Sequence, residues 1–592
     1  MKASIPALGF ACLLLSGCLH TESALKAEQE AAKEKDLAIR MVGDVTELSR
    51  VGPWQVTGVG LVTGLAGTGD APKGKLRNDL EQQLLKQKAE HVQAMLDDPN
   101  NCLVIVTASI HPGAHKGDPL DLEITLPAGS KATSLQGGYL QETVLYNHDT
   151  TRHLSPEYSG GDRWIKGHAL ARAKGRLLVG LANPGEPGEE RRGRIWEGGV
   201  SLVDRPFYLT LKNDDKSIRI ANDVATRINF LFQDDAKKRE AVLRNRHLLL
   251  LDDVTHKLNG EKRTDMARAV SKERIDVYVP HNYRLDPERY LRVVRLMPLR
   301  EDPAKSVAYR KRLSEMLLEP HDAVRAALRL EALGTESVAV LRKGLTSPHP
   351  IVRFAAAESL LYLDNMAGVD ELAKLAEQYP LVRMNALLAL GSSEESICKQ
   401  KLAHMLASPN TPLRCGALWV MRLNRDMMEE TPEFRNPYLN TEPIGKAFWL
   451  HKPAPEAPSL VQVTVSGRSE VALFGAPVRV QAPLRLSAGS DFIVSVENGD
   501  ELCTISRISA RTGVRREQCS LALEDVLRTM VTLGAGYPEV VDLLRKLDAR
   551  GGLPCPVAIN VLPEPVPLDR LISEGREMGK EGTAATAATA AK

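Results

Sequence analysis

Three groups of residues could in principle support chemistry: a glycine-rich loop, a histidine pair and a set of cysteines. The loop ends in Gly-Thr-Gly-Asp at residues 67–70, but the Lys-Ser/Thr pair that completes a phosphate-binding loop does not follow it. His111 and His115 are spaced like two metal ligands, yet Pro112 and Gly113 prevent a shared helical face and no third ligand is near. The sequence shows no Gly-x-Ser-x-Gly elbow. We therefore expect no enzyme activity, cofactor, nucleotide site or metal site.

Six cysteines lie beyond the N-terminal apolar segment, at positions 102, 398, 415, 503, 519 and 555. An oxidising compartment would permit disulfides between them. Cys503 with Cys519 would bridge two strands or a long hairpin, and Cys398 with Cys415 would join neighbouring helical repeats. Buried free thiols are the alternative interpretation, and the sequence leaves both open.

The N-terminus indicates export. Lys2 precedes an apolar stretch, Ile5–Gly17, that is too short to span about 30 Å of hydrocarbon but suits the core of a signal peptide. Leu-Ser-Gly-Cys at residues 15–18 is typical of a bacterial lipobox, which predicts a lipid anchor on Cys18; a plain cleavable signal is the alternative. Leu19, in place of a retention aspartate, favours the outer membrane. Residues 1–17 are thus the predicted signal and 18–40 an Ala/Glu/Lys-rich tether.

Length and charge exclude some functions. A chain of 592 residues predicts several domains, and 43% hydrophobic residues are enough for ordinary cores. The 77 basic and 75 acidic residues give a formal charge of only +2, so no net field attracts phosphate polymers. We expect no nucleic-acid partner.

Between residues 41 and 300 the pattern mixes strands and helices. Residues 56–70 form an apolar ribbon whose glycines allow close backbone approach or positive φ, while its valines and leucines favour a strand. Residues 103–108 indicate a buried strand and residues 120–125 a half-exposed one, with a Pro-Gly turn between them. Further elements are expected as a strand at 209–214 that leads into a helix with an apolar face over 218–228, and a strand at 275–280.

From about Asp302 the strands stop and a helical repeat begins. An apolar residue followed by arginine recurs at intervals of 28, 30 and 31 residues, at Val324-Arg325, Val352-Arg353, Val382-Arg383 and Leu413-Arg414. A period near 30 indicates an α-solenoid, because one helical pair cannot bury its apolar face without stacked neighbours. These repeats, over 302–426, resemble short HEAT-type repeats. We expect each arginine to order the turn between helices, and the stack to offer a surface to another protein.

The remaining sequence predicts a linker, a second α+β region and a tail. Residues 427–458 carry six prolines and are expected to form neither one helix nor a central strand. Residues 459–563 show several strands, then two helices separated by a Leu-Gly turn, and a final strand. Residues 564–592 are Ala/Thr-rich at their end and are expected to be disordered. The predicted fold class is therefore α+β and multidomain, with β-rich regions interrupted by an α-solenoid insertion.

Two of these regions resemble the flagellar basal-body P-ring family. The N-terminal likeness includes the ribbon, the strand–turn–strand block that ends in Ser-Leu-Gln-Gly-Gly at 134–138, and a Gly-Arg-Ile turn followed by glycines over 193–200. The C-terminal likeness is the succession of sheet, helix, Leu-Gly turn, helix, glycine and strand. Together the two stretches, 41–300 and 459–563, cover more than half of the chain.

The resemblance implies a structural, non-enzymatic subunit of the P ring, the periplasmic bushing around the rotating flagellar rod, which supports motility. It implies a homo-oligomeric ring, with the rod and L-ring subunits as partners and peptidoglycan as a further one. Close packing in the ring would fall to the glycines of the ribbon, Gly58, Gly60, Gly64, Gly67 and Gly69. P-ring subunits usually carry neither a lipid nor a helical array of this size.

A second hypothesis comes from a different class of protein. The chain would be a non-flagellar cell-envelope lipoprotein whose helical repeats bind another protein, with the P-ring-like part as a scaffold. Gene neighbours that encode rod or L-ring subunits would favour the P-ring hypothesis over this one.

Overall fold

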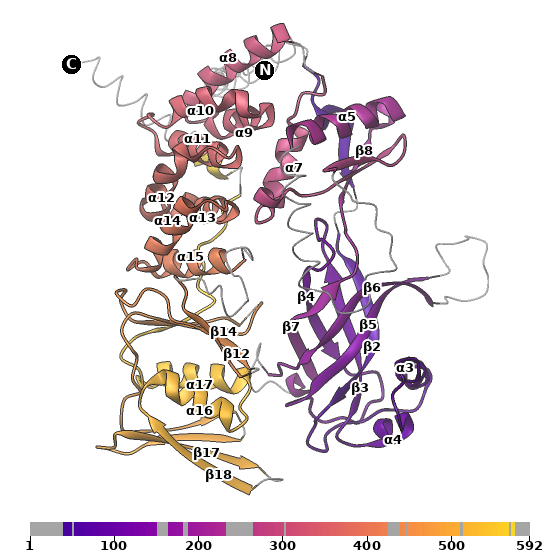
Figure 1. Cartoon of the computed structure of the whole chain (residues 1–592), viewed down its shortest axis with the longest axis vertical. Coiled ribbons are helices and arrows are strands. Elements are labelled where there is room, and N and C mark those ends of the chain that lie inside the picture. Colours follow the sequence, from indigo (N-terminus) through magenta and orange to yellow (C-terminus); the bar gives the residue numbers. More distant parts are fainter. Residues whose placement is uncertain are drawn as a thin grey trace, which may run out of the picture.

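The computed structural model of the chain describes residues 39–49, 52–150, 164–180, 188–232, 265–300, 303–423, 438–445, 447–465, 467–489, 491–509, 513–567 and 570–574. These residues form two columns that lie side by side (Figure 1). One column holds a β-barrel below a small sheet with helices, and the other holds a stack of helices above a second α+β module. The predicted signal peptide, nearly all of the tether and most of the tail lie outside the described residues.

The lower half of the first column is a closed β-barrel. Its strands are β2 (Trp54–Thr63), β3 (Cys102–Ile110), β4 (Pro119–Thr125), β5 (Tyr139–Thr150), β6 (Trp164–Arg176) and β7 (Arg192–Ser201). They pair antiparallel in the order β2-β3-β4-β7-β6-β5, and apolar side chains such as Val56, Val104 and Leu122 fill the interior. The sequence-based predictions of strands at 103–108 and 120–125 are confirmed.

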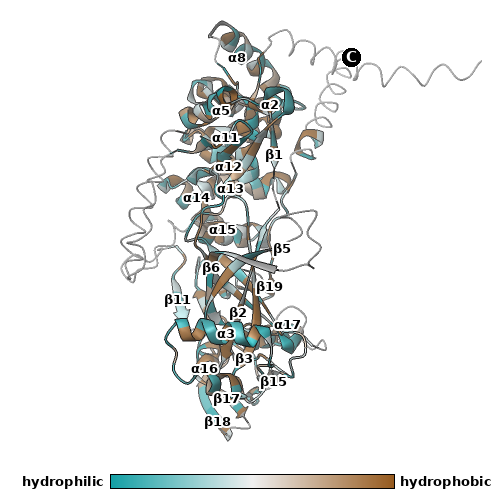
Figure 2. Ribbon diagram, turned by 90° about the vertical axis from the view of Figure 1, so that its right-hand side faces the viewer, coloured by the Kyte–Doolittle hydropathy of each residue, from teal (hydrophilic) through white to brown (hydrophobic). Residues whose placement is uncertain are grey.

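Two helices cover one side of this barrel, α3 (Lys75–Lys86) and α4 (Val92–Asp97). Leu80, Leu84 and Leu96 pack with Leu61 and Leu103 of the barrel wall, whereas the outer side of α3 is hydrophilic (Figure 2). On the opposite side of the barrel, the segment 193–200 was expected to turn. It instead lies within strand β7, where only Glu197 bends the strand with a φ of +52°.

The upper half of the first column is a four-stranded antiparallel sheet in the order β1-β8-β10-β9. Ser217 begins the long helix beside it by accepting a hydrogen bond from the Ile220 amide, and Asp286, followed by a proline, caps the next helix. The elements are α2 (Val42–Val45), β1 (Thr46–Ser49), β8 (Phe207–Leu211), α5 (Ile218–Leu231), β9 (Ala267–Ala269), β10 (Arg274–Val277) and α7 (Pro287–Arg295).

The second column begins with the expected helical repeat. Its helices are α8 (Pro303–Leu318), α9 (Ala323–Leu333), α10 (Val338–Gly344), α11 (Pro350–Tyr362), α12 (Val369–Gln378), α13 (Arg383–Ser392), α14 (Ser396–Leu406) and α15 (Thr411–Leu423). Short 3-10 turns occur in both columns. Those before the stack are η2 (Glu189–Arg191), η3 (Asn213–Asp215) and η5 (His281–Tyr283), and those within it are η6 (Thr335–Ser337), η7 (Met366–Gly368) and η8 (Pro380–Val382). The four repeated apolar-arginine pairs lie at or beside the start of α9, α11, α13 and α15, so the period read from the sequence is the period of the stack.

The second column ends in an α+β module with two sheets. One sheet has the order β11-β12-β14-β13-β19 and the other the order β15-β16-β17-β18. Their strands are β11 (Thr441–Ile444), β12 (Phe448–His451), β13 (Leu460–Val463), β14 (Glu470–Phe474), β15 (Leu484–Ala488), β16 (Phe492–Val496), β17 (Leu502–Ser509), β18 (Gly513–Ser520) and β19 (Val557–Ile559). Two helices pack with them, α16 (Leu523–Thr532) and α17 (Tyr537–Ala549).

The predicted helix–turn–helix of this module is confirmed. Gly534 adopts a φ of +99°, and the Ala535 amide donates to the Met530 carbonyl at 2.9 Å, which ends α16. The linker prediction over 427–458 is wrong for its second half, because β11 and β12 lie there. β12 pairs parallel with β14 in the middle of its sheet, and that long-range pairing outweighs the proline-rich composition around it.

One continuous hydrophobic core joins the upper sheet, the helical stack and the first sheet of the C-terminal module. The stack is therefore built into the body of the protein. Residues after β19 return to the stack, where Val566, Leu571 and Ile572 are buried and Pro563 lies against Gly416. The prediction of a disordered tail from residue 564 is thus wrong for these residues. Within the part of the chain that the structure describes, no helix has the length and apolar character needed to cross a membrane.

Candidate assembly site

The glycines of β2 let this strand pack closely against β5. A Cβ at position 58 would lie 2.5 Å from the Val144 carbonyl oxygen and 2.9 Å from a methyl of Leu145, and one at position 60 would lie 2.8 Å from Leu140 and Thr143. These contacts come from β5, the strand that closes the barrel against β2. Only glycine lets the two strands approach this closely.

The other three glycines of the ribbon act in the loop that follows. A Cβ at Gly69 would lie 2.2 Å from the Asn101 carbonyl oxygen, while Gly64 and Gly67 have φ values of +83° and +79° that side chains rarely adopt. The sequence therefore located close-packing glycines, and the contacts that the structure shows for Gly58, Gly60 and Gly69 are within one chain. A role of these glycines between subunits of a ring stays a prediction.

The barrel and the C-terminal module meet at a seam that sequence analysis did not find. Arg468 donates from Nε to Glu197 Oε2 at 2.6 Å, and Gln136 donates to Glu539 Oε1 at 2.9 Å. Trp196 and Tyr537 contact edge to face with ring centroids 6.2 Å apart. Leu178 of the barrel is buried in the core of the C-terminal module. The barrel and the C-terminal module thus contact each other across the seam, beside the stack that connects them in the chain.

Strand β7 presents its side of the seam through a local bend. Glu197 has a φ of +52°, and its amide donates to Asp121 Oδ1 at 2.8 Å, which holds the bend against β4. Trp196 and Glu197 therefore reach the C-terminal module from adjacent positions of one strand. Burial is the largest influence on Asp121 and raises the pKa of its carboxyl group above its ordinary value.

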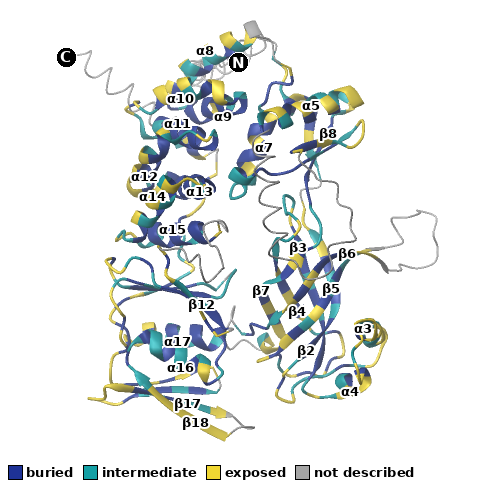
Figure 3. Cartoon of the chain, viewed as in Figure 1, coloured by how far each residue is buried: buried dark blue, intermediate teal, exposed yellow. Residues whose placement is uncertain are grey.

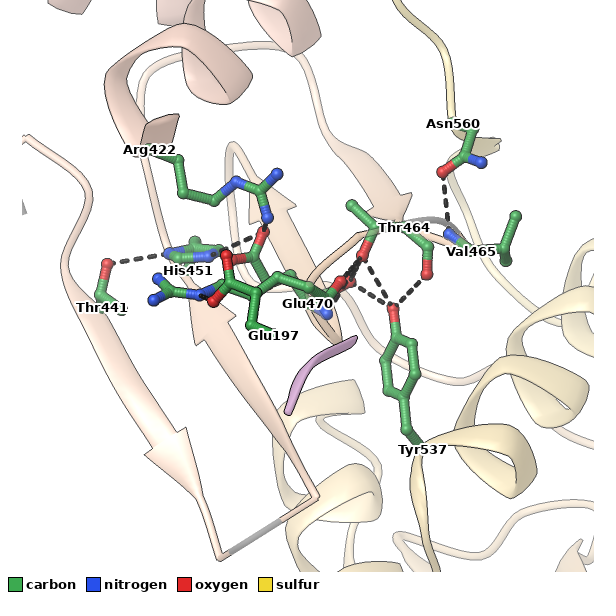
Figure 4. A network of polar contacts seen from close by, with 10 residues as sticks. Glu197, Arg422, Thr441, His451, Thr464, Val465, Glu470, Tyr537 and Asn560 are labelled. Atoms are coloured by element: carbon green, nitrogen blue, oxygen red, sulfur yellow. Dashed lines mark hydrogen bonds and ion pairs between the residues drawn. The ribbon is translucent and has the colours of Figure 1, made fainter. Parts of the chain in front are cut away.

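A buried polar network lies behind the seam, where α15 meets the first C-terminal sheet (Figure 4). Arg422 donates to Glu470, and His451 Nε2 lies 3.7 Å from the same carboxylate oxygen. Tyr537 donates to the carbonyl oxygens of Thr464 at 2.7 Å and of Glu470 at 2.6 Å. Burial opposes ionisation of Glu470, but the nearby His451 ring and the charge of Arg422 outweigh it and lower the pKa of that carboxyl.

A second buried network joins α7 to the stack. Arg289 contacts Glu331 of α9 at 2.6 Å and Glu358 of α11 at 2.5 Å, and the Tyr283 hydroxyl donates to Glu331 at 2.8 Å. The guanidinium also lies 4.6 Å from the centroid of the Tyr362 ring. Burial is the main reason that the pKa of Glu358 rises to about 7, and the charge of Arg289 opposes that rise. One arginine therefore ties the first column to two successive repeats.

The repeated arginines of the stack behave as the sequence predicted at two of their four positions. Arg383 donates to the carbonyl oxygens of Ala376 and Glu377, which lie in the preceding helix. Arg353 donates to the carbonyl oxygens of Ser347 and Pro348 in the turn before α11. Arg414 differs, because its Nη1 donates to the Pro458 carbonyl at 2.6 Å and so links the stack to the C-terminal module.

The described cysteines are free thiols in the structure. Cys503 and Cys519 lie directly opposite each other on β17 and β18, as the hairpin prediction required. Cys398 and Cys415 lie on the neighbouring helices α14 and α15 in one hydrophobic core, and burial raises the pKa of Cys398 to about 11 and that of Cys415 to about 12. A disulfide between this second pair stays a prediction beside the free-thiol alternative.

No catalytic or metal-binding arrangement emerges among the described residues. His111 and His115 lie in the turn between β3 and β4, where the His115 amide donates to Asp118. No group of three or more potential metal ligands forms in the described part of the chain. Two surface hollows of about 530 and 560 Å³ lie beside α8 and beside α3. The three arginines around the first are paired with acids, Arg40 with Asp215, Arg300 with Asp223 and Arg310 with Glu336.

Truncating Trp196 to alanine is expected to loosen the seam. The substitution removes the aromatic contact with Tyr537 and part of the apolar contact with the C-terminal core, at a cost of about 2 kcal/mol of docking free energy. We expect a larger radius of gyration in small-angle scattering and faster proteolysis around the seam.

Val200→Ala is the matched control, because Val200 lies on the same strand and is 44% exposed. We expect it to leave both readouts unchanged. Identical scattering curves for Trp196→Ala and the unmodified chain would show that the seam is held by other contacts.

Comparison with known proteins divides the chain in the same way. Residues 41–319 match the family model for flagellar P-ring protein, and residues 338–422 match HEAT repeats. The flagellar P-ring protein of Thermotoga maritima is 25% identical over 269 residues, which cover 44% of this chain and 68% of that protein. Those of Helicobacter pylori and Campylobacter jejuni are 35% identical over 152 residues and 29% over 207, covering 25% and 33% of this chain and 38% and 54% of theirs.

The P-ring match begins just before α2 and includes all of α8, so it ends directly after the first helix of the stack. The HEAT match confirms the repeat type that the sequence predicted. The likeness of residues 459–563 to P-ring proteins lies outside the matched residues and stays a prediction.

Proposed function

This chain has the structural, non-enzymatic function of a flagellar P-ring protein, and from that premise we propose how its own parts serve a ring in the periplasm. The barrel and the C-terminal module would act together as one ring-building block around the flagellar rod. The observation that carries this proposal is the seam, where Trp196 and Glu197 of the P-ring-matched region contact Tyr537 and Arg468 of the C-terminal module. The rod, the L-ring subunits and peptidoglycan would be its neighbours.

The helical stack would act as a rigid internal connection between the two ends of this block. One side of it packs against the segment that includes Arg289, and residues 561–567 and 570–574 return to it as well. These contacts occupy part of the stack within the same chain, which weakens the alternative of a non-flagellar lipoprotein that works through its repeats. Domain limits follow as proposals: a P-ring-like region over 41–300, a stack over 302–426 and a C-terminal module that begins near residue 438.

A lipid on Cys18 would hold the ring at the outer membrane. Cys18 lies outside the described residues, and the support is the lipobox pattern alone. The described chain begins at Ile39, and the Arg40 carbonyl accepts a hydrogen bond from the Leu299 amide beside α8, so an anchor would enter the molecule at the upper end of both columns. Several acyl chains would be needed for a stable anchor.

Imaging of basal bodies tests the whole proposal. Basal bodies purified from a strain with a tagged chain should carry the tag in the periplasmic ring, and a deletion strain should lack that ring and lose motility. Cys18→Ser should move the protein from the membrane fraction to the soluble fraction. A motile deletion strain with intact rings and no second copy of the gene would reject the function, whereas a soluble ring that still assembles would reject only the anchor.

The Cys503–Cys519 pair is a candidate disulfide of the exported protein. The hydrogen bond between the two thiols raises the pKa of Cys503 and lowers that of Cys519, so Cys519 is the more readily ionised thiol. Its thiolate would attack a protein disulfide oxidant, and Cys503 would then displace the oxidant's thiol. The pair loses two protons and two electrons, and the oxidant is reduced to its dithiol.

Alkylation of the denatured chain without reductant should therefore modify two thiols fewer than alkylation after reduction, as measured by intact mass. Cys503→Ser and Cys519→Ser should each remove that difference, and Cys415→Ser, which replaces a buried thiol elsewhere, should preserve it. Equal alkylation of the unmodified chain with and without reductant would show that the pair stays reduced.

A further inference from the structure

The last strand of the second C-terminal sheet has an open edge. β18 is the outermost strand in the order β15-β16-β17-β18, and residues 513–518 are all exposed (Figure 3). It pairs with β17 along its full length of eight residues. An edge strand of this length presents a row of backbone donors and acceptors to any strand that approaches it.

Apolar side chains accompany this edge on one face of the hairpin. Ile508 and Val514 are cross-strand partners, and they are 49% and 57% exposed. Leu502, which lies on the same face of β17, is 47% exposed. Ile508 and Val514, exposed side by side next to an open strand, indicate a contact surface, whereas single exposed apolar residues do not.

The opposite edge of the same sheet is protected. Lys546 donates from Nζ to the Ser487 carbonyl of β15 at 3.0 Å and to its hydroxyl at 3.2 Å. The Gly489 amide at the end of β15 donates to Asp542 Oδ2 at 2.8 Å. The C-terminal module thus covers one edge with side chains of α17 and leaves the other edge open, an asymmetry that matters for a protein that assembles.

We propose that the β17–β18 hairpin is a contact surface between neighbouring copies of this chain, which bind its open edge and its Leu502-Ile508-Val514 face. The inference rests on the proposed function, because a ring of identical subunits needs head-to-tail contacts between two different surfaces of the chain. Backbone hydrogen bonds at a strand edge fix the relative orientation of the two copies, and the apolar face adds buried apolar surface to the contact. Arg515, Arg516 and Glu517 restrict pairing to a strand of compatible charge, which disfavours indiscriminate aggregation.

Self-association of the full chain purified in detergent tests this surface. The variant Ile508→Lys/Val514→Lys removes the exposed apolar pair without touching the core of the module. We expect the concentration of half-maximal assembly to rise at least tenfold in light scattering, with fewer rings in electron micrographs. Phe230→Lys is the matched control, since Phe230 is 66% exposed on α5 and should leave assembly unchanged.

Hydrogen exchange provides a readout that does not depend on a substitution. In assembled rings the amides of β18 that face away from β17 should exchange at least tenfold more slowly than in the monomer. Unchanged exchange, or assembly of the lysine variant at the concentration of the unmodified chain, would overturn the inference while leaving the ring intact. An unmodified chain that neither self-associates nor appears in basal bodies would instead overturn the proposed function, and the inference with it.

Discussion

Replacing Arg289 with alanine is expected to lower the free energy of unfolding of the upper body by about 3–5 kcal/mol, the largest effect that we predict for one side chain. The side chain of Arg289 is 8% exposed, and those of its partners Glu331 and Glu358 are 0% and 4% exposed. Removal of the guanidinium leaves two buried carboxylates without their cation. Urea unfolding followed by circular dichroism measures the loss, and hydrogen exchange should locate it in α9 and α11.

Arg292→Ala is the matched control for this substitution. Arg292 lies on the same helix, but its pair with Glu288 is 3.5 Å long and exposed, a kind of pair that contributes well under about 1 kcal/mol. The two variants remove the same charge and nearly the same helix propensity. Similar losses from both would show that the buried network is not what joins α7 to the stack.

The same network predicts that stability falls as pH rises. The pKa of Glu358 in the folded chain is about 7, above its ordinary value of 4.5, so the folded state binds a proton more tightly than the unfolded state. The stabilising effect is therefore complete below the unfolded pKa and is lost as the pH rises through about 7. Between pH 5 and pH 8 it amounts to about 2–3 kcal/mol.

Glu358→Gln should remove this pH dependence, because glutamine does not titrate. The difference in unfolding free energy between the variant and the unmodified chain isolates Glu358 from the other titrating groups. In Arg289→Ala the deficit should shrink toward pH 5, where the orphaned Glu358 takes up a proton. A deficit that is constant from pH 5 to pH 8 would contradict the assignment of this carboxyl as the titrating group.

Local patterns in the sequence predicted the elements well. The strands β3 and β4 follow from the alternation and apolar content of residues 103–108 and 120–125, and the stack follows from a period near 30. The first signal lies within one short window, and the second is a pattern that recurs along the chain at a regular interval. They survive in the fold because each element buries the face that its own sequence makes apolar.

Contacts between distant segments could not be predicted in this way. β12 was missed because its four residues lie among prolines and become a central strand only through parallel pairing with β14. The seam joins Trp196 to Tyr537, and nothing in either local sequence indicates the other. Burial of Arg289 could have been suspected, since it lies in a helix beside the apolar Tyr290 and Val293. Its partners could not have been predicted, because the two acids come from separate repeats.

The glycines of β2 show where sequence reasoning is incomplete. The spacing predicted close backbone approach or positive φ; a Cβ at Gly58 would lie 2.5 Å from a backbone carbonyl oxygen, whereas one at Gly60 would meet side chains. A sequence cannot say whether the approaching backbone belongs to the same subunit or to the next one. The structure supplies a neighbour within the chain, strand β5, and a substitution can distinguish that neighbour from another subunit.

Gly58→Val is expected to destabilise the barrel by about 3 kcal/mol or more, because the new side chain would meet the Val144 carbonyl at 2.5 Å and neither strand of a closed barrel can retreat. Gly64→Ala has room, with the nearest atom at 3.9 Å, but its φ of +83° should cost about 1 kcal/mol. Gly52→Ala has neither constraint and is the control.

Urea unfolding of the monomer and ring assembly, measured on the same three variants, separate the two roles of the ribbon. If the glycines serve closure of the barrel, the monomer stabilities should fall in the order Gly52→Ala, Gly64→Ala, Gly58→Val, and assembly should fail only where the monomer is unstable. If they serve contacts between subunits, Gly58→Val should leave the monomer stable and abolish the ring. The first outcome is expected, because β5 already occupies the space that the missing side chain leaves.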